Sequence, residues 1–517
     1  MMSEPGEKVQ TEEQPLPSGW MKLKLSAAIE PRGDKVSPAN FPDLPFIGMD
    51  HVEAHTTKII GSIPAREMKS NAARFYAGDI LYGRLRPYLN KVAQPKNDGL
   101  ASAEFIVFPE NKLIKNSFLK YRLNARDFVN FANHLNEGDR PRVSFEQIGD
   151  FDLLVPPAAE QNRITNKLEE LLSELDKGVE NLRTAQQQLK VYRQALLKHA
   201  FEGKLTAEWR AQNPDKLESV ETLLARVRRE REARYQQQLA EWQEVQQAWE
   251  AAGKTGSKPA KPKALKPPPP LTAEELAELP ELPEGWAWMK VHQLCEVVRG
   301  GSPRPAGDPK FYDGSIPFLK VADLTKDSSP YLTSHTYTIK EAGLNKTRQI
   351  KPNTLLLTNS GATLGVPKIC LISATMNDGV AAFLGLPQDQ LLSHYYFWQS
   401  QTPRLRNIDQ GAAQPNLNTD LIKETPIPVC SPVETATLTQ KIEAALSGAD
   451  QLEKTIITSL QQAEALRQSI LKKAFSGQLV PQHPGDEPVS VLLERIRAER
   501  AAPKPTAKRG RKVAKSA

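Results

Sequence analysis

Cysteine is scarce in this 517-residue sequence and occurs only at positions 295, 370 and 430. These separations fit no zinc-binding pattern, and three thiols cannot form a disulfide framework, so we expect neither. Long apolar runs are also lacking. The mean hydropathy is −0.49, and the sequence contains no stretch of about 18 apolar residues, the length that a membrane-spanning helix needs. Residues 1–8 contain no apolar core typical of a secretion signal. We therefore expect a cytoplasmic protein with no membrane partner.

The common catalytic motifs are absent as well. The sequence contains no G-x-x-x-x-G-K-[ST] loop, no H-E-x-x-H helix and no Asn/Asp-Pro-Pro-Tyr/Phe motif that would hold a target base for methylation. One nuclease-like string can be assembled from Pro42-Asp43 and Glu67-Met68-Lys69. Its loose spacing favours a surface turn and a solvated charge pair instead. We predict no catalytic residue, no metal ligand and no cofactor bound by this chain.

The positive charge is unevenly distributed. The net charge is +7 and the pI is about 9.0. Residues 253–270 hold five Lys and residues 500–517 hold seven Lys and Arg, with no acid in either stretch. These two stretches account for +12, so the remainder of the chain carries −5. The overall charge therefore does not by itself indicate nucleic-acid binding, and any DNA-binding surface must be a local one.

The sequence contains an internal duplication. Four segments recur in the same order with shifts of 266–274 residues: LPSGW at 16–20 and LPEGW at 282–286, PFI at 45–47 and PFL at 317–319, YRQALLKHAFEG at 192–203 and LRQSILKKAFSG at 466–477, and LLARVRRER at 223–231 and LLERIRAER at 492–500. The order and the nearly constant shift indicate two copies of one unit, about 16–234 and 282–503.

Each copy has a β-rich first part and a helical second part. Short apolar runs bounded by turn residues, such as 104–108 and 354–357, are typical of strands. The fold class we predict is α+β with a pseudo-twofold duplication. The predicted organisation is a disordered segment 1–15, a β-rich domain 16–157, a long helix with a distal helix 158–234, a helical and then Pro/Lys-rich linker 235–281, a second β-rich domain 282–430, a second long helix with a distal helix 431–502, and a disordered basic tail 503–517.

Apolar residues repeat every seven positions in both helical parts. This heptad pattern predicts a coiled-coil seam, with the other copy's seam as its partner. Gly203 and Gly477 follow the last apolar turn, where a left-handed cap favours glycine. The predicted seam residues are Leu168, Leu175, Leu182, Leu189 and Leu196 in the first copy and Ile442, Leu452, Ile456, Leu466 and Ile470 in the second.

Several loops combine cationic and amide side chains, which are the groups that read base edges. Arg can form two hydrogen bonds with guanine, and Asn or Gln can do so with adenine. Ordinary polar loops are the alternative interpretation. The candidate DNA-binding residues are Arg84, Arg86, Tyr88, Asn90, Lys91, Arg140 and Arg142 in the first copy and Asn359, Ser360, Thr363, Arg404, Arg406, Gln414 and Asn416 in the second.

With these features, the chain resembles the specificity subunit of type I restriction-modification systems. The resemblance rests on Leu-Pro-x-Gly-Trp at each domain start, on residues 155–157 (VPP) and 426–428 (PIP) at each domain end, and on R-Q-x-[LI]-L-K-x-A-F-x-G-x-L at 193–205 and 467–479. The string QPNLN at 414–418 also looks like that family, whereas the first copy departs from it with PRVS at 141–144.

The resemblance implies two target recognition domains, each reading one half of a split, asymmetric double-stranded DNA sequence. It implies that the two long helices pack antiparallel and fix the spacing between the half-sites. It further implies two modification subunits and restriction subunits as partners, with S-adenosylmethionine, ATP and Mg²⁺ bound by those partners. A methyltransferase or nuclease with built-in recognition domains, and a coiled-coil interaction protein without DNA, are the alternatives we weighed.

Overall fold

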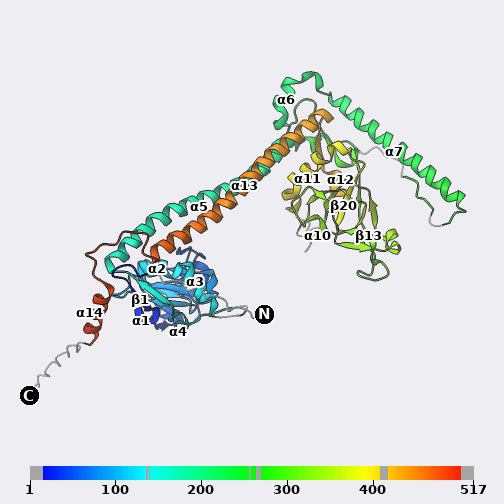
Figure 1. The fold of residues 1–517 in the computed structure, drawn as a ribbon. Coiled ribbons are helices and arrows are strands. Elements are labelled where there is room, and N and C mark those ends of the chain that lie inside the picture. The colour runs from blue at the N-terminus through cyan, green and yellow to red at the C-terminus, as the bar shows by residue number, and fades with distance from the viewer. Residues whose placement is uncertain are drawn as a thin grey trace, which may run out of the picture. The chain divides into compact units, whose positions relative to one another are not determined.

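The computed structural model describes residues 15–135, 138, 140–255, 258–262, 269–361, 363–407 and 417–501. The predicted tail 503–517 and, apart from residue 15, the predicted segment 1–15 lie outside this range. The described residues belong to two compact units. Unit 1 combines the chain up to residue 184 with the chain from residue 456, and unit 2 comprises residues 185–455 (Figure 1). Each unit is described on its own.

Unit 1 contains the first β-rich domain. Its buried strands are the apolar runs of the sequence, and short β1 alternates Met, Lys, Leu and Lys, which leaves the lysines exposed. The sheets have the orders β1-β10, β2-β5-β8-β3-β4 and β7-β6-β9. The elements are β1 (Met21–Lys24), α1 (Leu25–Ala28), β2 (Lys35–Val36), β3 (Pro45–Ile47), β4 (Ile63–Pro64), β5 (Ala72–Phe75), β6 (Ile80–Gly83), β7 (Val92–Ala93), β8 (Gly99–Ala101), β9 (Phe105–Phe108), α2 (Asn116–Asn124), α3 (Arg126–His134), α4 (Phe145–Ile148), β10 (Asp152–Val155), the start of α5 (Ala158–Phe201), the end of α13 (Pro432–Phe475) and α14 (Val489–Ala501).

The core of unit 1 joins distant parts of the chain. Phe118 of α2 is fully buried, and its ring meets the ring of Phe475 edge to face, with the centroids 5.3 Å apart. Val489 and Leu492 of α14 are buried in the same apolar cluster. The end of the second copy's helical part therefore completes the core of the first copy's domain.

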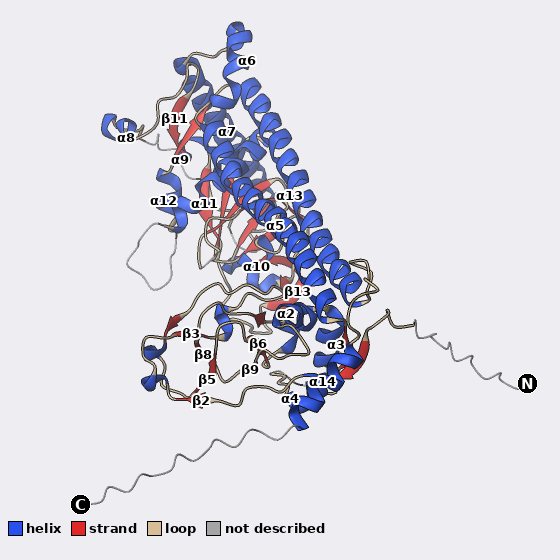
Figure 2. Ribbon diagram, turned by 90° about the vertical axis from the view of Figure 1, so that its left-hand side faces the viewer, coloured by secondary structure: helices blue, strands red, loops and turns tan. Residues whose placement is uncertain are grey.

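Unit 2 contains the second β-rich domain, whose strands are drawn in red in Figure 2. Its sheets have the orders β11-β21, β12-β20-β17-β18-β14 and β15-β13-β19-β16. Its core is completed in the same way, because the Phe201 ring of α5 meets Phe397 edge to face at 5.4 Å. The elements are α6 (Ala207–Gln212), α7 (Val220–Ala251), α8 (Ala273–Ala277), β11 (Ala287–Lys290), α9 (Val291–Leu294), β12 (Glu296–Arg299), β13 (Tyr312–Leu319), α10 (Val321–Leu324), β14 (Tyr331–Leu332), β15 (Tyr337–Ile339), β16 (Arg348–Ile350), β17 (Thr354–Thr358), β18 (Pro367–Cys370), β19 (Ala374–Met376), β20 (Val380–Leu384), α11 (Leu391–Arg406), α12 (Thr419–Glu424) and β21 (Pro426–Val429).

The long helices α5 and α13 each contain 44 residues and lie antiparallel within each unit. In unit 1, Arg467 of α13 pairs with Asp176 of α5. In unit 2, Arg193 of α5 pairs with Asp450 of α13 at 2.6 Å. The two ion pairs are equivalent, because Arg467 lies 274 positions after Arg193 and Asp450 lies 274 positions after Asp176. The duplication predicted from sequence therefore extends to the contacts that hold the helices together.

Most residues of the predicted seam are buried or half-buried, and two residues of the second copy are exposed. The leading residues, from Leu168 to Leu196 and at Ile442, Ile456 and Ile470, are buried or half-buried. Leu452 and Leu466 instead have 57% and 51% of their surface exposed. The next residues, Glu453 and Arg467, take the inner positions. The reason is that each pairs with a charge on the facing helix, which lets the charged head lie at the seam.

Candidate nucleic-acid interface

The turn after β6 displays the first group of candidate residues. Gly83 at the end of the strand donates its N–H to the carbonyl of Lys91, at 2.8 Å, which closes residues 83–91 into a loop. The side chain of Asn90 is 3% exposed and donates to the Asn124 carbonyl at 3.0 Å. Asn90 thus anchors the loop from inside. The structure places the Asn90 side chain inside the loop rather than on its surface, and its contact with DNA stays a prediction.

A second loop lies against the first. The Arg86 N–H donates to the Pro141 carbonyl at 2.7 Å, and the Val143 N–H donates to the Arg84 carbonyl at 3.0 Å. Ser144 then caps α4, accepting from the Gln147 N–H. The two stretches that the sequence offered as separate candidates therefore form one structure. We call residues 83–91 together with 140–144 the two-loop module of domain 1.

The arginines of this module surround a cavity. Leu85, Arg86, Arg140 and Arg142 line a space of about 550 Å³. The Arg142 guanidinium donates to Glu104 Oε1 at 2.5 Å. Two other buried polar atoms, Arg84 Nε and Glu104 Oε2, have no hydrogen-bond partner in the structure. A cavity with converging guanidinium donors is suited to an anionic or acceptor-rich ligand such as a phosphate or a guanine edge.

One acidic residue near the module, Glu146, is held in its charged form. The pKa of the Glu146 carboxyl lies below its usual range, mainly because of its hydrogen bond with the Ser144 hydroxyl. The backbone N–H of Glu146 and the positive charge of Arg84 lower this pKa further.

The two other predicted residues of this turn differ in their availability. Tyr88 is 44% exposed, whereas the Lys91 ammonium donates to the Met49 carbonyl. Tyr88 remains a candidate contact, and Lys91 is engaged by the protein.

Domain 2 builds the same module on a different sequence. The Thr358 N–H donates to the Val366 carbonyl at 3.0 Å, and the Leu417 N–H donates to the Asn359 carbonyl at 2.8 Å. Both bonds have their counterparts in domain 1, 274 or 275 residues earlier. Asn418 also caps α12 as Ser144 caps α4. The structure thus aligns PRVS of domain 1 with the end of QPNLN, although the two strings share little sequence. Gln414 and Asn416 themselves lie outside the described residues.

The remaining candidates of domain 2 are dispersed. Asn359 is fully buried, and neither polar atom of its side chain is hydrogen-bonded, while its predicted DNA contact stays a prediction. Ser360 and Thr363 are half-buried at the loop. Arg404 and Arg406 are exposed at the end of α11, and Arg406 donates to the Leu364 carbonyl at 3.0 Å. Domain 2 therefore presents hydroxyls and two arginines where domain 1 presents an arginine cavity.

Sequence reasoning missed two features. Glu104, which orients Arg142, gave no signal because it lies in an unremarkable strand entry. In domain 2, the Lys320 ammonium lies 3.6 Å from the ring centroid of Tyr337, and this ring is 38% exposed. A cation stacked on an exposed aromatic ring at a sheet edge is a further candidate for a phosphate or base contact. Lys320 directly follows β13 and Tyr337 begins β15, and neither position by itself signals a binding site in the sequence.

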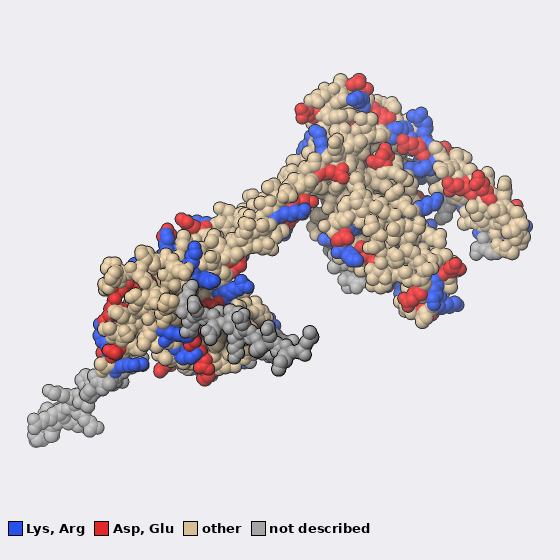
Figure 3. Space-filling model, viewed as in Figure 1, with Lys and Arg blue, Asp and Glu red and all other residues tan. Residues whose placement is uncertain are grey.

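Positive and negative side chains are mixed over the face of the molecule seen in Figure 3. The charge is therefore sorted locally, as in the arginine cavity, rather than over one broad basic face. Among the parts of the chain that the structure describes, no helix is long and apolar enough to cross a membrane. The same parts bring together no group of three or more His, Cys, Asp or Glu side chains that could hold a metal ion.

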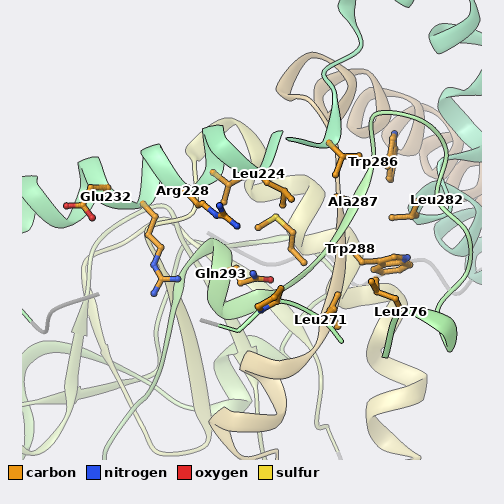
Figure 4. Close-up of a pocket in the computed structure, with 15 residues that line it drawn as sticks. Leu224, Arg228, Glu232, Leu271, Leu276, Leu282, Trp286, Ala287, Trp288 and Gln293 are labelled. Carbon is orange, nitrogen blue, oxygen red and sulfur yellow. The ribbon is translucent and has the colours of Figure 1, made fainter. Parts of the chain in front are cut away.

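A second cavity, of about 820 Å³, has a different character. It lies in unit 2 between the start of α7, strand β11 and residues 270–282 (Figure 4). Leu224, Leu271 and Trp288 give it an apolar lining, and Arg228 stands at its edge. Residues 270–281 belong to the linker rather than to the repeated unit, so this cavity is not part of the duplicated architecture.

Comparison with known proteins agrees with this picture. Residues 283–462 match the family model of the type I restriction modification DNA specificity domain. The chain is 29% identical over 224 residues to the type I restriction enzyme EcoDI specificity subunit of Escherichia coli, which covers 42% of this chain and 50% of that protein. It is 23% identical over 414 residues to the EcoKI specificity subunit of Escherichia coli strain K12, covering 77% of this chain and 74% of that protein.

A solved structure concerned with complex assembly of the type I R-M system contains a chain of the same fold. The TM-score is 0.63 at 18% identity, and the match covers 90% of this chain and 100% of that chain. This likeness shows a shared fold, in which each domain of the present chain carries one two-loop module. The chain is therefore similar to type I restriction enzyme specificity subunits, and its residues 283–462 carry the match to the DNA specificity domain. It spans half the length of the EcoDI relative.

Proposed function

We propose that this chain is the DNA-recognition subunit of a type I restriction-modification complex, with each domain reading one half of a split, asymmetric target. One observation carries the proposal. The two domains hold the same two-loop module by the same backbone hydrogen bonds, but place different side chains on it. A shared scaffold with different readers suits two unlike half-sites, because base edges discriminate by side-chain chemistry while the scaffold sets position.

The chemistry of the complex then lies in its partners. We infer that the chain is non-catalytic by itself, because its relatives are named as the specificity subunits of type I restriction enzymes. Two modification subunits would transfer the methyl group of S-adenosylmethionine to adenine, and restriction subunits would use ATP and Mg²⁺ to cut unmodified DNA. This chain would supply the sequence choice and, through the paired helices α5 and α13, the spacing between half-sites. The cytoplasm is the compartment where such a complex would meet DNA.

Genome-wide mapping of methylated adenines tests this function. The chain is co-expressed with its cognate modification subunit in cells that lack other methylation, and methylated positions are read by single-molecule sequencing. We expect a split motif with one methylated adenine in each half. A well-assembled complex that methylates nothing would contradict the proposal, and methylation by the purified chain alone would revive the alternative of a fused methyltransferase.

We further propose docking positions for the modification subunits, and the duplication supports them. Two identical partners must find the same chemistry twice, so exposed residues that are identical in both copies are the candidates. Lys198 and Lys472 form one such exposed pair, and Arg228 and Arg497 form another. The apolar cavity of Figure 4 is not predicted to be a shared docking surface, because the linker residues that line it occur once.

Native mass spectrometry of charge-reversed variants tests this assignment. We expect Lys198→Glu or Lys472→Glu to reduce the bound modification subunits from two to one, and the double variant to bind none. Lys190→Glu is the matched control, since Lys190 is equally exposed on α5 but corresponds to Glu464 in the second copy. A single variant that loses both subunits, or a double variant that retains both, would contradict the docking model.

A further inference from the structure

The backbone of the two-loop module singles out one residue. In domain 2 the turn contains two glycines with left-handed backbones, Gly361 at φ +79° and Gly365 at φ +82°. The corresponding residues of domain 1, 275 positions earlier, are Arg86 at φ +51° and Asn90 at φ +46°. Both domains therefore use the same turn. Domain 2 fills its left-handed positions with glycine, which adopts them freely, whereas domain 1 places side chains there.

Asn90 and Arg86 occupy their left-handed positions for different reasons. Asn tolerates the left-handed region, and Asn90 is accounted for by its bond to the Asn124 carbonyl. Arg86 gains no such internal contact. Its side chain is exposed, and it has no ion pair within the described part of the chain. A residue held in a strained conformation without an internal contact for its side chain indicates a role toward a ligand.

The surroundings of Arg86 keep its guanidinium available. The Arg86 N–H is fixed by the Pro141 carbonyl at 2.7 Å, so the start of the side chain is positioned. Arg140 and Arg142 line the same cavity, and the Glu104 carboxylate is engaged by Arg142 at 2.5 Å. The neighbouring guanidinium groups carry the same charge as Arg86, and the Glu104 carboxylate forms its ion pair with Arg142 rather than with Arg86. The Arg86 side chain therefore lines a space that is suited to an acceptor-rich ligand.

We propose that Arg86 is the specificity-determining residue of domain 1 and reads a guanine in the half-site of that domain. The two parallel N–H donors of a guanidinium match the O6 and N7 acceptors of guanine in the major groove. Arg140 and Arg142 line the approach and contact phosphate oxygens, which contribute affinity without sequence choice. This assignment rests on the proposed function, because it requires that the module of domain 1 meets DNA.

The test uses the full chain in complex with its modification subunit. Arg86→Gly introduces the residue that domain 2 has at this place, so the variant relieves the backbone and should fold. A melting temperature equal to or above that of the wild type checks this point. We expect the wild-type motif to contain a G·C pair at a fixed position of one half. In the variant, discrimination at that position alone should fall about 5- to 150-fold, measured as relative methylation rates of duplexes carrying each base pair.

Two further variants sharpen the readout. Arg86→Lys keeps the charge without the fork, and we expect it to lose discrimination while retaining overall binding. Arg66→Gly is the matched control, because Arg66 is another exposed arginine in a turn of the same domain and pairs with Asp43 at 3.2 Å. This variant should leave the motif unchanged.

The outcomes separate the two levels of the argument. A folded Arg86→Gly complex that methylates the wild-type motif with unchanged selectivity would overturn the reading role and leave the proposed function intact. Relaxation at a base pair other than G·C, or in both halves, would also overturn it. A wild-type complex that assembles without methylating DNA would overturn the proposed function, and the assignment of Arg86 with it.

Discussion

The Phe475 side chain connects the far end of the chain to the first domain, and its removal gives a sharp test of how the units are built. Phe475 is 7% exposed and lies at the last residue of α13. Its ring meets Phe118 edge to face, and the Arg122 guanidinium lies 5.1 Å from its centroid. Phe475→Ala removes both contacts and leaves a cavity between α13 and α2.

The expected magnitude follows from the size of the lost side chain. Truncation of a buried Phe to Ala costs about 3–5 kcal/mol, because the apolar transfer energy is lost and the cavity collapses only in part. At 1.4 kcal/mol per tenfold, the equilibrium constant for opening unit 1 should rise roughly 100- to 4,000-fold. Unit 2 should be unaffected, since its core cluster contains neither ring.

Hydrogen–deuterium exchange resolves the two units in one experiment. Phe475→Ala should accelerate exchange in the buried strands β6 and β9 and leave β17 and β20 unchanged. Phe201→Ala is the matched reciprocal variant, because the Phe201 ring meets Phe397 in unit 2 at 5.4 Å. It should accelerate β17 and β20 alone. If Phe475→Ala accelerates both units equally, or leaves β6 and β9 as protected as before, the division of the cores that underlies this reasoning is wrong.

Two further predictions concern the helices and the second domain. Leu182→Asp together with Leu189→Asp should lower the melting temperature and impair assembly. Each substitution places a charge on the half-buried seam at a cost of about 2–3 kcal/mol. An unchanged melting curve by circular dichroism and intact assembly would contradict this. Burial lowers the pKa of His394 to about 4, so the unfolded chain binds a proton below pH 6.5 that the folded chain does not, and stability should fall by up to about 3 kcal/mol between pH 6.5 and pH 4. His394→Leu should remove that part of the pH dependence in urea titrations, and an equally steep decline would refute it.

The coiled-coil seam shows which helix positions a seven-residue repeat can predict and which it cannot. A seven-residue repeat fixes one face of a helix, and the leading positions from Leu168 to Leu196 follow it. It does not decide whether the residue three or four positions later completes the seam. Leu452 and Leu466 are the apolar choice, yet Glu453 and Arg467 lie inside because Arg193 and Asp176 face them. That choice depends on the partner helix, which a single helix sequence does not contain.

The recognition loops show a second limit. Sequence reasoning located both loops of each domain by their Gly, Arg and Asn content. It treated them as separate, because the hydrogen bond from Val143 to Arg84 joins residues 59 positions apart and leaves no trace in composition. It also took Asn90 for a reader, since an exposed reading amide and a buried anchoring amide are the same residue type. Burial, which the fold decides, distinguishes them.

The contacts between copies explain which residues repeat and which differ. Gly477 ends the second long helix with φ +74°, and a Cβ there would lie 2.5 Å from Pro17 Cγ, at the start of the first domain. Gly203 stands in the same relation to Pro283, with φ +71° and 2.5 Å. Each contact takes one half from each copy, so a change in either copy must be matched in the other. Among the described residues, the backbone hydrogen bonds that hold each two-loop module join residues of its own domain, so one copy can carry Arg86 where the other carries Gly361.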